Sequence, residues 1–96
     1  MSRVELTAAA VTDLDRLIRT HSLPMNTKRR VKPSLAPLRR FPRLGPELTG
    51  RWRDFRFLLG PWRWMLIVYV FIEDDERVVV VTIQDARSSS AATAER

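Results

Sequence analysis

The stretch GPWRWMLIVYVF, residues 60–71, decides the fold because a long apolar run follows directly on turn residues. A membrane-spanning helix needs about 20 apolar residues, so this run is too short to cross a bilayer. Short apolar runs between turn signals are typical of buried strands. Gly60-Pro61 begins the stretch, and the acidic EDDE at 73–76 follows it. We therefore predict a central strand over Trp62–Ile72.

Two neighbouring segments have the composition of strands that pair with this one. Asp54–Leu59 ends at a glycine, and Arg77–Gln84 is β-branched over most of its length, as strands often are. The EDDE segment has the length of a hairpin connection. Near the start of the chain, Arg3–Leu6 alternates polar and apolar residues, so we predict a further strand there.

Two helical segments lie between the first strand and the other three. Thr7 is a suitable N-cap for a helix over Ala8–His21, whose apolar residues share one face. A second helical segment is predicted over Asn26–Phe41. Pro33 and Pro37 interrupt it. Because proline lacks an N–H and crowds the preceding turn, we expect a kink or two short helices.

The order β-α-α-β-β-β predicts one α+β domain over residues 1–96, with two helices on one face of a small, mainly antiparallel sheet. Residues 88–96, SSSAATAER, are small and polar and are predicted to fray or to form a short helix. The N-terminus has no continuous apolar core of the kind found in signal peptides. We therefore expect a cytoplasmic protein that does not bind a membrane.

Alternation along the strands raises the question of what covers the second face of the sheet. In the central strand, one face is predicted to carry Trp62, Trp64, Leu66, Val68 and Val70, and the other Arg63, Met65, Ile67, Tyr69 and Phe71. In the last strand, the same rule places Val80 and Ile83 on opposite faces. Two short helices cover only one face. The other is covered either by a protein partner or by the kinked second helix, the 41–50 loop and the tail. The predicted partner contacts are Trp62, Trp64, Leu66 and Val68.

The net charge of +6 is concentrated in one part of the chain. From Lys28 to Arg53, nine Lys or Arg residues stand against one acid, Glu47. Such a basic stretch fits an anionic partner, either nucleic acid or an acidic protein, and it also fits a solvated surface. The absence of cysteine excludes disulfides, thiolate nucleophiles and Cys-ligated zinc.

Most kinds of enzymatic site have no counterpart in the sequence. The only histidine, His21, has no acid at a ligand-like spacing and is interpreted as a residue favoured by the C-terminal end of a helix. There is no glycine-rich phosphate loop, and the acids at 13, 15 and 73–76 fit a solvated helix side and a turn. We therefore expect neither a metal site nor a cofactor.

Arginines on or beside the strands are the remaining candidates. The candidate catalytic residues are Arg56, Arg63 and Arg87, and the candidate nucleic-acid contacts are Arg51 and Arg53. Arginine binds phosphate with a bidentate fork, so a cluster of arginines can assist attack of an RNA 2′-OH on the next phosphate without a metal. The alternative is that these arginines form ion pairs or lie on the surface.

The order and spacing of these segments resemble the RelE/ParE family of bacterial type II toxin–antitoxin toxins. The resemblance runs from Arg3 to about Ser88 and rests on RVEL, AAAVTDLDRLI, LAPLRRFPRLGPELTG, DFRFLLG, WRWMLIVYVF and VVVVTIQDAR. Its most recognisable part is the pattern LxxLxxFPxxGxxLxG at residues 35–50. The resemblance implies a cognate antitoxin that wraps the toxin and covers the second face of the sheet.

The same resemblance implies one of two activities. RelE-like members cleave mRNA on the ribosome, whereas ParE-like members inhibit DNA gyrase and are not nucleases. We expect the first, a metal-independent endoribonuclease. The alternatives are a gyrase inhibitor, and a non-toxic basic module of the same fold that binds nucleic acid or protein.

Three arginines correspond to positions in the family pattern. Arg56 matches a basic position on the strand after the loop, and Arg87 matches the arginine that ends the last strand. Arg63 is similar to the arginine of a G-Tyr-Arg-x-x-Tyr strand, but here five residues instead of two separate it from Tyr69. RelE-like members also tend to carry a C-terminal Tyr or His, and the tail SSSAATAER has neither.

Overall fold

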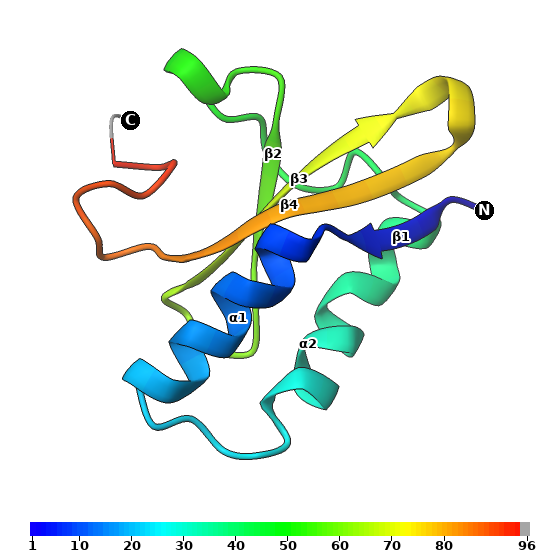
Figure 1. Cartoon of the computed structure of the whole chain (residues 1–96). Helices are drawn as coiled ribbons and strands as arrows, with labels where there is room; N and C mark the ends of the chain where they lie inside the picture. Colours follow the sequence, from blue (N-terminus) through cyan, green and yellow to red (C-terminus); the bar gives the residue numbers. More distant parts are fainter. Residues whose placement is uncertain (95–96) are drawn as a thin grey trace.

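The computed structural model of the chain describes residues 1–94 and has an α+β fold (Figure 1). Its strands are β1 (Arg3–Leu6), β2 (Arg56–Leu59), β3 (Met65–Ile72) and β4 (Arg77–Asp85), and its helices are α1 (Ala8–Thr20), α2 (Thr27–Leu35) and three 3₁₀ segments (Ala36–Arg39, Gly50–Trp52 and Glu73–Asp75). The strand order in the sheet is β1-β4-β3-β2. β1 is parallel to β4, and the other two pairings are antiparallel. The predicted fold class and element order are confirmed.

Thr7 fixes the start of α1 and ties it to the sheet. Its hydroxyl accepts a hydrogen bond from the Ala10 N–H at 3.0 Å and donates one to the Val81 carbonyl at 3.2 Å. The first of these bonds satisfies a helix N–H that has no partner within the helix, as the sequence predicted. From this start, α1 buries Ala10, Leu14 and Leu17 in the core between helices and sheet.

The second helical segment is divided into two short helices, as predicted. α2 contains Pro33 and ends at Leu35, and the 3₁₀ helix with Pro37 in its first turn continues it. The inner side of this segment buries Val31, Leu35 and Leu38. Both helices therefore pack on the same face of the sheet, and the other side of α2 is left in contact with solvent (Figure 1).

A β-bulge in β4 changes which residues face the helices. The pairing register of β3 and β4 shifts between Val68 and Tyr69, and Val81 is the extra residue. Because of this insertion, Ile83 lies in the helix-side core together with Val80, while Val81 packs on the other face. The expectation that Val80 and Ile83 lie on opposite faces is therefore wrong.

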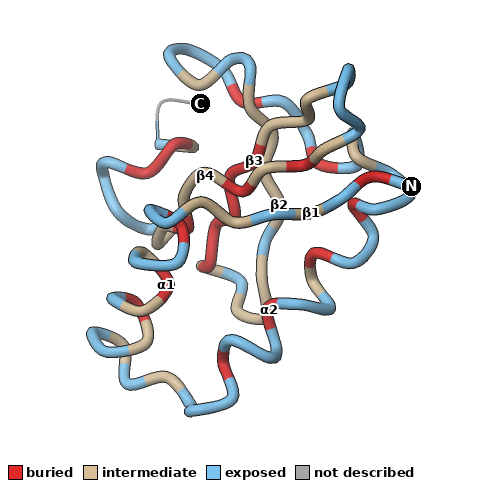
Figure 2. The backbone as a smooth tube through the Cα atoms, turned by 45° about the vertical axis from the view of Figure 1, so that its right-hand side comes forward, coloured by how far each residue is buried: buried red, intermediate tan, exposed pale blue. Residues whose placement is uncertain are grey.

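The second face of the sheet is covered by the chain itself. The core on this face consists of buried Leu48, Leu66, Val68, Ala91 and Ala92, with Trp52, Phe55 and Phe57 packed against them. Figure 2 shows the buried stretch of the tail near the C-terminus. The Ala92 N–H donates a hydrogen bond to the Gln84 side-chain oxygen at 2.8 Å, which holds the tail on the sheet. Of the two covers that the sequence left open, residues 1–94 supply the intramolecular one.

The tail packs without regular structure up to residue 94, where turns replace the short helix considered above. Residues 95 and 96 of the predicted tail lie outside the described part of the chain. Within residues 1–94, no helix has the length and apolar character that a membrane span requires.

Trp62 and Trp64 lie on the opposite face of the sheet from Leu66 and Val68. β3 begins only at Met65, and the tryptophans belong to the preceding turn, so strand alternation does not extend to them. Both tryptophans pack against the helix-side core, whereas Leu66 and Val68 are buried in the core of the other face. The prediction that the four share one face is wrong, and in this structure they do not form one exposed surface for a partner.

Candidate functional site

Arg56 begins β2 and is bound to the loop that precedes the strand. Its guanidinium donates hydrogen bonds to the carbonyl oxygens of Gly45, at 2.8 Å, and Arg43, at 3.3 Å. It also forms an ion pair with Glu47 at 3.1 Å, and its side chain is only 21% exposed. Much of the hydrogen-bonding capacity of this arginine is therefore used within the chain.

Tyr69 lies opposite Arg56 on β3 and binds the same loop. Its hydroxyl accepts a hydrogen bond from the Gly45 N–H at 2.9 Å. Burial raises the pKa of the Tyr69 hydroxyl, although the Gly45 bond and the Arg56 charge act in the other direction. A Cβ atom at Gly45 would lie 2.2 Å from the Phe57 carbonyl oxygen, so only glycine fits there. We call Gly45, Arg56 and Tyr69 the loop anchor.

Arg56 and Arg87 lie at different levels of the sheet. Arg56 pairs with Tyr69, whereas Asp85, two residues before Arg87, pairs with Met65. At about 3.3 Å per residue, the two levels are about 13 Å apart along β3. Arg63 is exposed in the turn before Met65 and therefore lies toward the Arg87 end. The three candidate catalytic arginines do not come together at one end of the sheet.

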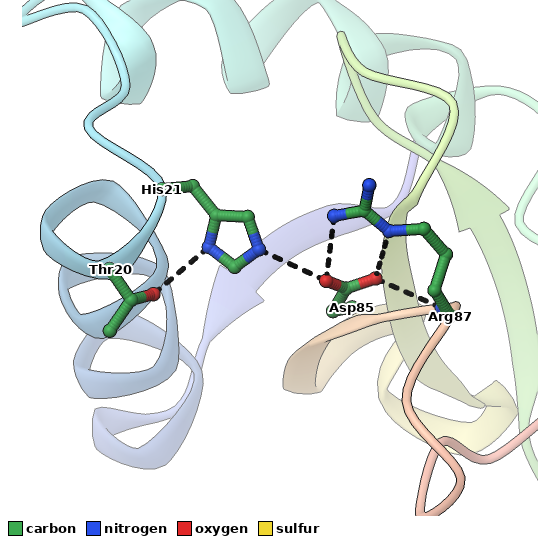
Figure 3. Close-up of polar contacts among 4 residues, drawn as sticks. All are labelled: Thr20, His21, Asp85 and Arg87. Carbon is green, nitrogen blue, oxygen red and sulfur yellow. Dashed lines mark hydrogen bonds and ion pairs between the residues drawn. The ribbon is translucent and has the colours of Figure 1, made fainter.

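A polar cluster joins the end of α1 to the end of β4 (Figure 3). Two nitrogens of the Arg87 guanidinium donate hydrogen bonds to the Asp85 carboxylate, at 2.9 and 2.8 Å. The same carboxylate lies 3.0 Å from His21 Nε2, and His21 Nδ1 lies 2.9 Å from the Thr20 hydroxyl. The Arg87 hydrogen bonds hold the pKa of Asp85 well below its usual range, against the effect of burial and with a smaller contribution from His21.

Trp62 and Trp64, in the turn before β3, pack against cationic side chains or the His21 ring. The His21 ring stacks on Trp64 with the ring centroids 4.4 Å apart, and the Arg87 guanidinium lies 5.0 Å from the Trp64 ring centroid. The Arg30 guanidinium lies 4.5 Å from the Trp62 centroid. These contacts take up ring surface that a nucleic-acid base would need for stacking.

Arg51 and Arg53 line separate hollows. The walls of a pocket of about 300 Å³ include three arginines and three acids, namely Arg43, Arg53, Arg56, Glu47, Asp54 and Glu73. This balance of charge makes the pocket a weak site for a phosphate. Arg51 lines a hollow of about 270 Å³ between Trp52 and the tail. Nucleic-acid contact by Arg51 and Arg53 stays a prediction.

A comparison with protein families shows where the chain belongs. Residues 4–89 match the model described as the ParE toxin of a type II toxin–antitoxin system, parDE. The chain belongs to the ParE toxin family. A solved structure of a chromosomal ParDE toxin–antitoxin system from P. aeruginosa has a similar chain, with a TM-score of 0.68 at 13% identity over 91% of this chain and 98% of that one.

RelE-type structures resemble this ParE-family toxin to a similar degree. A chain of the intact E. coli RelBE complex has a TM-score of 0.65 at 15% identity, over 92% of this chain and 100% of that one. A chain of the M. tuberculosis RelBE2 complex has a TM-score of 0.63 at 20% identity, over 88% and 90%. At these identities the likeness is one of fold. No curated protein sequence matches the toxin.

The polar cluster of this toxin was missed in the sequence. His21 has no acid nearby in the chain, and its partner Asp85 is 64 residues away. The one local signal is the spacing of Asp85 and Arg87 at the end of the last strand. Only Arg87 was predicted as a site residue from this pair. Within residues 1–94, no group of three or more His, Asp or Glu residues is placed to hold a metal ion.

Proposed function

We propose that this toxin arrests growth by inhibiting DNA gyrase and does not cut nucleic acid. The observation that carries the proposal is the match of residues 4–89 to the ParE model. Within the RelE/ParE resemblance, gyrase inhibition is the activity of ParE-like members. The sequence alone led us to expect mRNA cleavage, with gyrase inhibition as the alternative. The proposal now favours gyrase inhibition.

The positions of the arginines support the same choice. A metal-free nuclease needs cationic donors aimed together at one developing charge. Arg56 is bound to loop carbonyls and Glu47, and Arg87 forms an ion pair with Asp85. Their strand levels are about 13 Å apart along β3. Such a separation suits two structural roles better than one catalytic site.

A cognate antitoxin is the proposed tight partner. The similar structures from P. aeruginosa, E. coli and M. tuberculosis are toxin–antitoxin systems, which supports this partner. The test is co-expression with the small reading frame adjacent to the toxin gene. We expect growth to recover and the two proteins to purify together. Continued arrest, with the toxin purifying alone, would contradict the proposal.

Pulse labelling after induced expression tests the target. We expect incorporation of labelled thymidine to fall first, with double-strand breaks accumulating, while incorporation of labelled amino acids continues at early times. Purified gyrase should lose supercoiling activity when the toxin is added. If protein synthesis stops first and ribosome-bound mRNA is cut within codons, the mRNA-cleavage activity is correct and the gyrase proposal fails.

A further inference from the structure

The solvent side of α2 and of the 3₁₀ helix after it carries a row of basic residues. Arg29, Lys32, Arg39 and Arg40 are all exposed, and we call them the basic ridge. They alternate along the segment with Val31, Leu35 and Leu38, which are buried in the core. With a rise of about 1.5 Å per residue in α2 and about 2.0 Å per residue in the 3₁₀ helix, the row from Arg29 to Arg40 is about 19 Å long. In Figure 2 the tube of this segment alternates between exposed and buried residues.

The charge of the ridge is not neutralised by the chain. Within residues 1–94, no side chain of the ridge forms an ion pair, and the nearby Glu76, which lines a hollow with Arg39 and Arg40, pairs with neither. Other cations of the same region are paired. Lys28 binds Asp15 at 2.7 Å, and Arg43 binds Glu73 at 3.1 Å. Arg30, on the same helix, has no ion pair within residues 1–94 either, but its guanidinium lies over the Trp62 ring. The ridge is therefore the set of exposed cations of this segment that contact neither an acid nor an aromatic ring in the described part of the chain.

The chemistry of the ridge fits phosphate better than it fits a protein partner. Specific protein interfaces centre on large apolar or aromatic anchors. Between the cations of the ridge the exposed residues are Arg30, which is itself a cation, and the small residues Pro33, Ala36 and Pro37. The exposed Phe41 and Leu44 follow the ridge and do not interrupt it. A row of cations without anchors instead matches the regular charge of a nucleic-acid duplex, which carries about eleven phosphates in about 19 Å.

We propose that the basic ridge binds the phosphate backbone of duplex DNA without reading its sequence. The ridge carries no aromatic side chain for stacking on unpaired bases, which favours a duplex over a single strand. The choice of DNA over RNA rests on the proposed function, because gyrase acts on duplex DNA. In that setting, the ridge contacts the DNA that gyrase holds while another surface of the toxin contacts the enzyme.

Salt dependence of binding tests the ridge. The full-length toxin is titrated into a fluorescent 20-base-pair DNA duplex of arbitrary sequence, and anisotropy is followed from 50 to 200 mM NaCl. Four phosphate contacts predict a slope of about −3.6 for log K against log salt, which corresponds to about a 150-fold loss of affinity over this range. The triple variant Arg29→Gln, Lys32→Gln, Arg40→Gln should keep a slope of only about −0.9, or about a 3- to 4-fold loss.

A matched control removes the same amount of charge from paired positions. The triple variant Arg16→Gln, Lys28→Gln, Arg43→Gln also lowers the net charge by three. Each of these residues has an acidic partner, so the charges are removed from paired positions outside the ridge. We expect its slope to stay near that of the unchanged toxin. Equal loss of slope in both triple variants would mean that total charge and not the ridge controls binding, and it would overturn the proposal. Circular dichroism melting confirms that each variant is folded.

Two further probes identify the class of ligand. An RNA duplex of the same sequence and a poly-glutamate peptide are titrated under the same conditions. Tighter ridge-dependent binding of either probe than of the DNA duplex would overturn the DNA proposal in favour of RNA or an acidic protein. The gyrase proposal is judged separately by the pulse labelling. A toxin that binds DNA through the ridge but leaves DNA synthesis unchanged would contradict only the proposed function.

Discussion

The loop anchor and the polar cluster each centre on an arginine of the sheet, but they hold it in different surroundings. Arg56 is 21% exposed and donates to backbone carbonyls of the loop before β2. Arg87 is 62% exposed and grips one carboxylate at the surface. Solvent screens the second interaction, whereas buried polar groups left without partners are costly. The loop anchor around Arg56 therefore shapes the fold, whereas the ion pair of Arg87 contributes less to stability.

The largest effect should come from filling the space at Gly45. In Gly45→Ala the new Cβ would lie 2.2 Å from the Phe57 carbonyl oxygen and 3.0 Å from the Tyr69 hydroxyl. Backbone must move to relieve this clash, so we expect a loss of about 3 kcal/mol or more in the free energy of unfolding. Urea denaturation measures it.

Gly60→Ala is the control for that substitution. Its Cβ would meet the Met65 sulfur at 2.9 Å, and because this is the end of a flexible side chain it can shift. The loss of stability should be clearly smaller than for Gly45→Ala. Equal losses would show that the loop anchor has no special rigidity.

Tyr69→Phe should have the next largest effect. The change keeps the buried ring but removes the oxygen that accepts the Gly45 N–H, which then has no partner in a buried site. An unsatisfied buried donor typically costs about 1–3 kcal/mol. Denaturation of the purified variant tests this value. An unchanged midpoint would mean that the hydrogen bond does not contribute to holding the loop.

Asp85→Asn tests how much the polar cluster contributes to stability at different pH values. The pKa of Asp85 is lowered in the folded chain, chiefly by Arg87, so its contribution to stability is present above the unfolded value of 3.8 and is lost as pH falls below it. The melting temperature of the unchanged toxin should therefore fall as the pH is lowered from about 4 to about 2, and Asp85→Asn should reduce that fall. A parallel fall in both proteins would exclude Asp85 as a contributor.

Arg87→Ala should have the smallest effect, because growth arrest is expected to persist. This outcome distinguishes gyrase inhibition from mRNA cleavage. A gyrase inhibitor needs no catalytic arginine, so growth arrest on induction should persist in the variant. A nuclease that uses Arg87 at the developing phosphate charge should lose about 100-fold in rate. Growth curves after induction decide, with antitoxin co-purification as the folding control. Loss of arrest in a folded variant would restore Arg87 as a catalytic candidate.

Local rules were enough to predict the elements of this fold, and long-range geometry was not predictable from them. The Thr7 cap and the change to a 3₁₀ helix at Ala36, just before Pro37, depend on the chemistry of neighbouring residues, and both appear in the structure. The bulge at Val81 depends on how two strands pair, which no periodicity encodes. One extra residue then moved Ile83 to the other face of the sheet.

The candidate site was harder to predict than the fold for the same reason. The arginines were recognised as residues able to bind anions, but their partners come from distant parts of the chain. Asp85 pairs with His21 across 64 residues, and Arg56 binds the loop carbonyl of Gly45. Whether an arginine is available for a ligand depends on these contacts. The sequence shows only that an arginine is present.

The parallel pairing of β1 with β4 has a consequence for synthesis of the toxin. Arg3 pairs with Arg77, so β1 has no strand partner until β4, the last of the four strands, has been synthesised. β4 also lies between β1 and β3 in the sheet, and both cores include its side chains. A nascent or prematurely terminated chain that stops before β4 lacks an interior strand of the sheet and cannot complete either core. Both cores of the folded toxin therefore wait for the synthesis of β4, and a chain that stops before this strand yields no native sheet.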